Sequence, residues 1–133
     1  MKFYDLYRLI VEMHGDKWAG TSWSDTTKDG KQIKVTIQDI FNYSKNFPET
    51  ELGTDSLKSI ALHTTKNDQE TLNNIQKANL QYPILVLKKE NNKMSILDGH
   101  HRLQKAINNK IPKIKAKILD IKNMPKDWQW LFR

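Results

Sequence analysis

The sequence contains no cysteine among its 133 residues. This absence excludes disulfide frameworks, thiolate metal sites and cysteine-based catalysis, and it fits a reducing compartment. No apolar run approaches the roughly 18 to 20 residues that a membrane-spanning helix needs. The opening stretch MKFYDLYRLI carries Asp5 and Arg8 and lacks a small-residue cleavage site, so no secretory signal is predicted. We therefore expect a cytoplasmic protein with no membrane partner.

Arginine is also scarce: it occurs only at positions 8, 102 and 133, whereas lysine occurs 19 times. Asparagine occurs 11 times and isoleucine 13 times. We hypothesise that this bias reflects an A+T-rich genome, such as a small viral or phage genome. Because arginine is so rare in this sequence, Arg102, which lies far from both ends, stands out.

Positive charge is concentrated in the C-terminal part. Residues 83–133 hold 12 basic and 4 acidic residues, a net charge of +8, whereas residues 1–82 have a net charge of −1. A polyanionic partner would therefore meet the C-terminal part. A solvated lysine face that serves solubility alone is the equally weighted alternative.

The length and the 38% hydrophobic content suit one domain with a modest core. We predict a single α+β domain over 1–133, with an N-terminal extension and helices over 1–66, a core over 67–119 and a C-terminal helix over 120–133. No repeat, low-complexity tract or interdomain linker is evident.

Apolar spacing predicts helices and one strand in the N-terminal half. Helices are expected at 3–13, 37–46 (capped by Thr36 with Asp39), 55–63 (capped by Thr54, burying Leu57, Ile60 and Ala61) and 68–79 (burying Leu72 and Ile75). A strand is expected at 33–37. Residues 15–31 are rich in Gly, Ser, Thr and Asp, which predicts a long loop, either a functional flap or a poorly ordered segment.

The C-terminal half has clearer signals. Strands are predicted at 83–87, 94–97 and 113–118, helices at 101–109 and 124–133, and a polar turn at 90–93. The 15 residues between Leu97 and Lys113 suit a helical crossover between parallel strands, so 83–119 is expected to form a hairpin followed by a β-α-β unit. Within the terminal helix, Trp128, Leu131 and Phe132 are expected to pack on the core.

The segment Asp98-Gly99-His100-His101-Arg102 lies where a strand ends and a helix begins. The first N–H groups of a helix lack internal partners and favour anions such as phosphate. Gly99 would let a ligand approach the backbone. Arg102 could fork onto two phosphate oxygens, and both histidines could donate ring N–H bonds.

Each of these residues also has an ordinary structural interpretation. Asp98-Gly99 is a common turn, and Asp98 could cap the helix. The histidines could be idle in solvent, and Arg102 could pair with a carboxylate. The segment matches neither the Walker loop nor the dinucleotide fingerprint.

The stretch PILVLKKENNKMSILDGHHRLQKAINNKIPKIKAKIL resembles the ParB/sulfiredoxin-like superfamily, often called the ParB-like nuclease domain. The similarity covers 81–119 well and 67–119 loosely, and residues 1–66 match nothing that we can name. ParB proteins carry Gly-Glu-Arg-Arg and bind CTP at this turn, and sulfiredoxins carry Gly-Cys-His-Arg and bind ATP. Free-serine kinases of the superfamily carry Asp-Gly-His-His-Arg, identical to residues 98–102.

The resemblance implies a small mixed sheet flanked by helices that binds a nucleoside di- or triphosphate with Mg²⁺. Gly99, His100, His101 and Arg102 would hold phosphate, and Asp98 would be the general base or a metal-associated carboxylate. The kinases also use an acidic residue from their N-terminal half; Glu49 and Glu51 lie there, without a motif that assigns either.

Two differences from the family limit the functions that the resemblance implies. His100 occupies the position of the sulfiredoxin cysteine, so sulfinic-acid reduction is excluded. Only twelve residues follow Ile121, so the DNA-binding and dimerisation regions of full ParB proteins are missing from this sequence. A protein metal site built from Asp98, His100 and His101 is not expected, because adjacent side chains rarely converge on one ion.

Three functions remain open at this point. The first is nucleotide or phosphate binding, with phosphoryl transfer or hydrolysis if the protein is an enzyme. The second is a nucleic-acid-binding or nuclease-like module that uses Lys113, Lys115 and Lys117 along one strand, with tryptophans that stack on bases. The third is a protein-interaction version of the fold, with 15–31 as its contact surface. The oligomeric state is not predicted.

Overall fold

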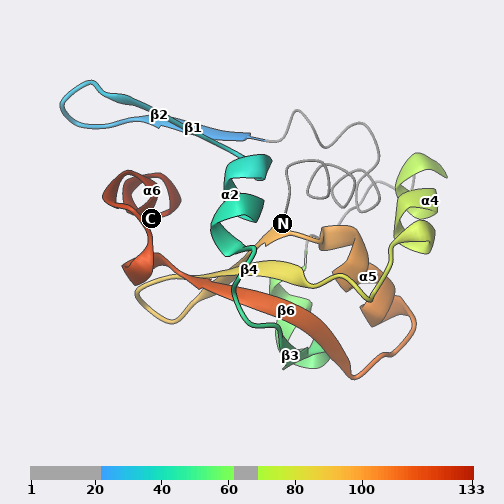
Figure 1. Cartoon of the computed structure of the whole chain (residues 1–133). Coiled ribbons are helices and arrows are strands. Elements are labelled where there is room, and N and C mark those ends of the chain that lie inside the picture. Colours follow the sequence, from blue (N-terminus) through green and yellow to red (C-terminus); the bar gives the residue numbers. More distant parts are fainter. Residues whose placement is uncertain (1–21, 62–68) are drawn as a thin grey trace. The chain divides into compact units, whose positions relative to one another are not determined.

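The computed structural model describes residues 22–61 and 69–133 (Figure 1). The protein is a mixed α+β structure with small sheets. Its chain divides into two compact units: a first unit of residues 1–47 and 120–133, and a second unit of residues 48–119. The helix predicted at 3–13 and the first part of the loop predicted at 15–31 lie outside the described residues.

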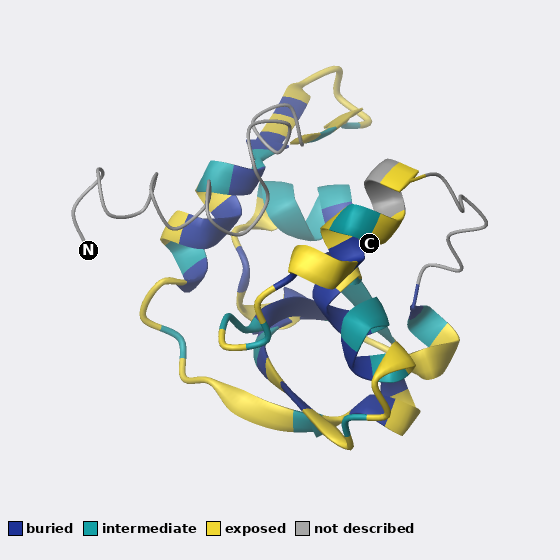
Figure 2. Cartoon of the chain, turned by 90° about the vertical axis from the view of Figure 1, so that its right-hand side faces the viewer, coloured by how far each residue is buried: buried dark blue, intermediate teal, exposed yellow. Residues whose placement is uncertain are grey.

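The first unit contains a two-stranded antiparallel hairpin of β1 (Ser22–Thr26) and β2 (Gln32–Thr36), in which Trp23 lies opposite Val35. The strand predicted at 33–37 is confirmed. Ile33 and Val35 are buried and their neighbours are not, which gives the alternating bands of β2 in Figure 2. The loop predicted over 15–31 is wrong at β1, which pairs with β2. The segment SWSDT has no apolar alternation of its own, so the sequence did not indicate a strand there.

Helix α2 (Ile37–Ser44) begins directly after β2, as predicted. The backbone N–H of Thr36 donates to the Asp39 carboxylate at 2.8 Å, and the Asp39 N–H donates to the Thr36 hydroxyl at 3.2 Å. This reciprocal capping box satisfies donors that the first helical turn would otherwise leave unpaired. Ile40 and Phe41 face inward and are buried.

The C-terminal segment of the first unit contains a 3₁₀ turn, η3 (Ile121–Asn123), and helix α6 (Lys126–Phe132), which follows Pro125 as predicted. Phe132 is buried and forms an edge-to-face pair with Trp23, with ring centroids 5.5 Å apart. Trp128 packs at 5.1 Å from Tyr43 of α2. Aromatic contacts therefore hold α6 against both the hairpin and α2.

The second unit contains a four-stranded sheet. Its order is β3 (Thr50–Gly53), β6 (Lys113–Asp120), β4 (Ile84–Lys88) and β5 (Met94–Asp98), with β3–β6 and β4–β5 antiparallel. The predicted strands and the β4–β5 hairpin are confirmed. Strand β4 lies between β5 and β6, so the helical connection does not join neighbouring strands. Sequence reasoning missed β3, whose four residues TELG carry no apolar periodicity.

The helices of the second unit are α3 (Thr54–Leu57), the 3₁₀ turn η2 (Lys58–Ile60), α4 (Gln69–Lys77) and α5 (His100–Asn108). Within the helix predicted at 55–63, residues 54–60 form one α-turn followed by a 3₁₀ turn, and residues 62–63 lie outside the described residues. The predicted cap is wrong, because Thr54 lies inside the α-turn and Gly53 precedes it without a side-chain cap. The burial predicted for Leu72 is also wrong, since 46% of it is exposed.

A lysine of α5 binds the C-terminal end of helix α4. The Lys105 ammonium donates to the carbonyls of Gln76 and Ala78 at 2.9 and 2.8 Å, and Ile75 and Ala78 form the buried side. A lysine on a neighbouring helix thus satisfies carbonyls that the end of α4 leaves without helical partners.

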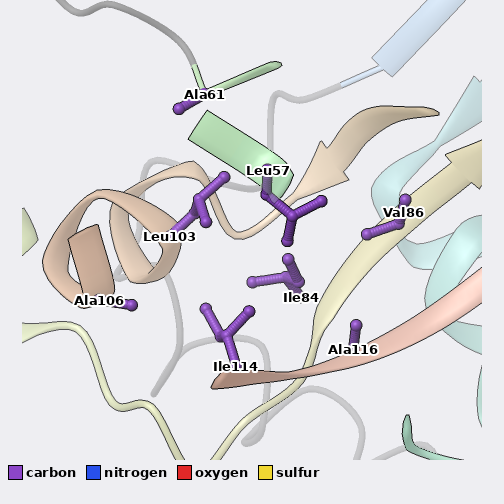
Figure 3. Close-up of a cluster of buried hydrophobic side chains, with 8 residues drawn as sticks. All are labelled: Leu57, Ala61, Ile84, Val86, Leu103, Ala106, Ile114 and Ala116. Atoms are coloured by element: carbon purple, nitrogen blue, oxygen red, sulfur yellow. The ribbon is translucent and has the colours of Figure 1, made fainter. Parts of the chain in front are cut away.

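The core of the second unit joins the sheet to α3 and α5 (Figure 3). Its buried side chains come from β4, β6, α5 and the segment 57–61: Leu57, Ala61, Ile84, Val86, Leu103, Ala106, Ile114 and Ala116. Ile84 and Leu103 are fully buried, which fixes the start of α5 against the start of β4. This packing positions the segment that the sequence singled out.

Candidate functional site

The junction of β5 and α5 is built on a left-handed residue. Strand β5 ends at Asp98, helix α5 begins at His100, and Gly99 between them has φ = +100° and ψ = 22°. L-residues rarely adopt this conformation, so a glycine is required to turn the chain within one residue. The predicted strand–turn–helix arrangement is confirmed.

Gly99 does not leave an open approach to the backbone. A Cβ placed on it would lie 2.5 Å from Ile84 Cγ2 and 2.9 Å from Arg102 Nη2. The space over this glycine is therefore filled by the protein's own side chains, and the sequence-based expectation that a ligand enters there is corrected. Its role in the structure is to let the turn pack tightly on β4.

Arg102 points back toward the strand ends rather than outward. Its Nη2 donates to Asp98 Oδ2 at 2.9 Å and to the Pro83 carbonyl at 3.2 Å. Arg102 is 2% exposed and Asp98 is 7% exposed, so this is a buried ion pair. Of the alternatives that the sequence left open, pairing of Arg102 with a carboxylate is the one observed, and Asp98 does not cap α5.

Two nitrogen atoms at the start of α5 are buried without a hydrogen-bond partner among the described residues: Arg102 Nε and His100 Nδ1. Leaving a buried polar group unpaired costs about 1–3 kcal/mol. Such atoms are unusual in native interiors and call for a specific explanation. Both belong to residues that the sequence assigned to phosphate.

Burial also perturbs the titration of these two side chains. Desolvation lowers the pKa of Arg102, and the neighbouring Asp98 opposes that shift. Desolvation lowers the pKa of His100, against the opposing charge of Asp98 and with a further lowering by His101. The charged forms of both side chains are therefore less favourable than they would be in water. An anion bound beside them would favour the charged forms and raise both pKa values.

The remaining polar groups belong to the first turn of α5. The N–H of Leu103 closes the first helical hydrogen bond, to the Gly99 carbonyl at 2.9 Å. The N–H groups that precede it in a helix have no intrahelical acceptor, and they carry the positive end of the helix dipole. His101 is exposed beside them.

The lysines predicted for nucleic acid lie on β6. Lys113 and Lys115 are exposed and Lys117 is half-buried. Lys115 lies opposite Glu51 of β3 in the antiparallel register, so an acidic side chain accompanies the basic row. The tryptophans described belong to the first unit, where Trp23, Trp128 and Trp130 contact Phe132, Tyr43 and Arg133.

The one acidic side chain among residues 98–102, Asp98, is already engaged in an ion pair. Asp98 is the acidic side chain at the junction, and its Oδ2 already accepts from Arg102. Mg²⁺ in nucleotide sites is typically bound through one or two carboxylates and the substrate phosphates. Within residues 22–61 and 69–133, no three His, Asp or Glu side chains gather in a metal-binding arrangement. No step is therefore assigned to the Mg²⁺ that the resemblance implies.

The chain matches no known protein-family model, no curated protein and no solved structure. The ParB/sulfiredoxin resemblance accordingly stays a prediction that rests on residues 81–119. In the part of the chain that the structure describes, no helix has the length and apolarity needed to cross a membrane.

Proposed function

We propose that the second unit binds a phosphate-bearing ligand, such as a nucleotide, at the start of α5. The observation that carries this proposal is the presence of two buried, unpartnered nitrogens, Arg102 Nε and His100 Nδ1, beside a helix N-terminus. An oxyanion offers acceptors to N–H groups and balances the partial positive charge of the helix end.

The Asp98–Arg102 ion pair determines which groups remain available to bind such an anion. Because Nη2 of Arg102 is engaged by Asp98 and Pro83, the guanidinium does not present the two-pronged fork that the sequence suggested. The anion would be held by the ring of His100 and by Nε of Arg102, at the positive end of the α5 dipole. Asp98 and Arg102 act as positioning residues that fix the start of the helix, and the catalytic role of Asp98 stays a prediction.

Charge supports binding of an anion in this unit. Residues 48–119 contain 12 basic and 7 acidic residues, a net charge of +5. A net positive field raises the local concentration of phosphates and speeds their encounter with the protein. The exposed His101 adds a donor at the rim.

Thermal unfolding with a ligand panel tests the proposal. Inorganic phosphate, pyrophosphate, ATP, ADP, CTP and GTP are each added with and without Mg²⁺. A ligand that binds only the folded state raises stability by about 2.7 kcal/mol at 100 times its dissociation constant, so the midpoint rises with concentration. We expect at least one of these ligands to raise it.

The matched variants are His100→Ala with His101→Ala, and Lys113→Ala with Lys115→Ala. The histidine pair is expected to lose the ligand-induced rise, and the lysine pair to retain it. A panel that leaves the midpoint unchanged contradicts the proposal. A rise that depends on the lysine pair and not on the histidine pair contradicts it as well.

Nucleic-acid binding is the alternative function, favoured by the exposed Lys113 and Lys115 on β6. Glu51 opposite Lys115 reduces the positive field along this row. If this function holds, single-stranded DNA binds with an affinity that falls steeply with salt and requires the lysine pair.

A further inference from the structure

A hollow lies at the C-terminal end of α5, the end opposite His100. Its volume is about 280 Å³, just below the roughly 300–1,000 Å³ of typical small-ligand pockets. Its apolar wall comes from the last part of α5 and the turn that follows: Ala106, Ile107, Ile111 and Pro112. A wall of this kind accommodates a short hydrocarbon group.

Thr54 lines the same hollow and carries an unsatisfied hydroxyl. The residue is 3% exposed, and its Oγ1 is buried without a partner among the described residues. Its backbone N–H is engaged, since it donates to the Pro112 carbonyl at 2.9 Å. The Thr54 side chain can rotate between staggered χ1 positions, and a rotamer that directs Oγ1 to the hollow would give the hydroxyl a ligand acceptor as its partner.

The charged residues of the hollow are Lys58, Lys110 and Asp55. Asp55 is largely solvent-exposed and pairs with Lys58 at 2.9 Å, so these two side chains compensate each other. The Lys110 ammonium has no ion-pair partner within the described ranges. Lys110 also has φ = +55°, a conformation that Gly or Asn adopts more readily at a helix end.

We propose that this hollow binds a small organic carboxylate with a short aliphatic tail. The tail would lie on Ile107 and Ile111, and the carboxylate would accept from the Lys110 ammonium and the Thr54 hydroxyl. This arrangement supplies the missing partner of a buried polar group and balances the uncompensated lysine. The ligand is small, since the hollow is at the low end of the pocket range.

This site is distinct from the proposed phosphate site. Helix α5 has nine residues, so its two ends lie roughly 12–14 Å apart at about 1.5 Å per residue. None of the lining residues belongs to the segment 98–102. The two proposals can therefore fail independently.

An NMR titration of the full chain with sodium butyrate tests the inference, with sodium chloride at matched ionic strength as the blank. Butyrate has about six non-hydrogen atoms, so a dissociation constant in the millimolar range is expected. Saturable amide shifts should appear at 54–58 and 106–112. Butylammonium chloride, with the same tail and the opposite charge, should produce none.

Three variants sharpen the result. Thr54→Val keeps the shape of the side chain, and Lys110→Asn keeps a residue that tolerates positive φ; each is expected to weaken butyrate binding about tenfold, the loss of one hydrogen bond to a charged group. Asp55→Asn frees Lys58 and should strengthen binding. Thr54→Val should leave the thermal midpoint unchanged or raise it, because it removes an unpaired buried hydroxyl.

The inference is overturned if butyrate gives no saturable shifts at these residues, or if butylammonium binds as well as butyrate. It is also overturned if neither Thr54→Val nor Lys110→Asn weakens binding. Shifts confined to residues 99–103 on addition of inorganic phosphate bear only on the phosphate site, so failure of one proposal is distinguished from failure of the other.

Discussion

At the scale of single residues, the second unit contains a buried ion pair between Asp98 and Arg102. Both side chains are almost completely buried, and the guanidinium also donates to the Pro83 carbonyl at the start of β4. Removing two charges from water is costly, so such a pair adds little net stability compared with an apolar pair. It matters because neither partner can be removed alone without leaving a buried charge.

Asp98→Asn is therefore expected to destabilise the protein by about 3–5 kcal/mol, because the Arg102 charge then lacks its carboxylate. Urea unfolding followed by circular dichroism measures the change. The double variant Asp98→Leu with Arg102→Met is the control, and it should recover much of the loss since it removes both charges. An Asp98→Asn protein as stable as wild type would contradict the buried ion pair.

At the scale of elements, helix starts are set by different devices in the two units. Helix α2 uses a reciprocal box in which Thr36 and Asp39 satisfy each other's backbone donors. Helix α5 has no side-chain cap and begins from the left-handed Gly99. The first device stabilises a helix through its own residues, whereas the second turns the chain from strand to helix within one residue.

Thr36→Ala is expected to destabilise the protein by about 1 kcal/mol, because the Asp39 N–H loses its acceptor at the start of α2. Chemical denaturation gives the change in unfolding free energy. Thr36→Ser retains the hydroxyl and should lie close to wild type. Equal destabilisation by the Ala and Ser variants would show that the cap is not the cause.

At the scale of the whole molecule, the pH dependence of stability should report the environment of His100. Burial lowers its pKa below the ordinary value of about 6.5, and the neighbouring Asp98 and His101 act in opposite directions. The folded state then favours the neutral ring, so the unfolded state binds the proton first as pH falls. The stability linked to His100 is therefore fully present above about pH 6.5, and it is lost as the pH falls toward the folded-state pKa.

His100→Gln should flatten this decline below about pH 6.5, where one proton contributes at most about 1.4 kcal/mol per pH unit. Thermal midpoints at several pH values measure it. His101→Gln, at an exposed position, should keep most of the slope. A steeper or unchanged slope in His100→Gln would mean that another group titrates on unfolding. If phosphate binds as proposed, it should reduce the decline in the wild-type protein.

Local sequence determined many of the elements of this protein. The capping box of α2, the apolar run of β4, the alternation in β6 and the Gly99 turn are set by neighbouring residues, so their types could be predicted without the fold. Strands β1 and β3 could not, because SWSDT and TELG gain strand structure from pairing with β2 and β6. Likewise, the exposure of Leu72 depends on how α4 is placed by Lys105 from another helix.

The sequence by itself singled out residues 98–102 through a glycine, two histidines and a rare arginine. Only tertiary structure decided what those residues touch, because side-chain direction and desolvation depend on β4 packing beneath the turn. Ile84 fills the space over Gly99, and Pro83 with Asp98 draws Arg102 inward. The hollow at Thr54 and Lys110 had no sequence signal, since it joins segments more than fifty residues apart.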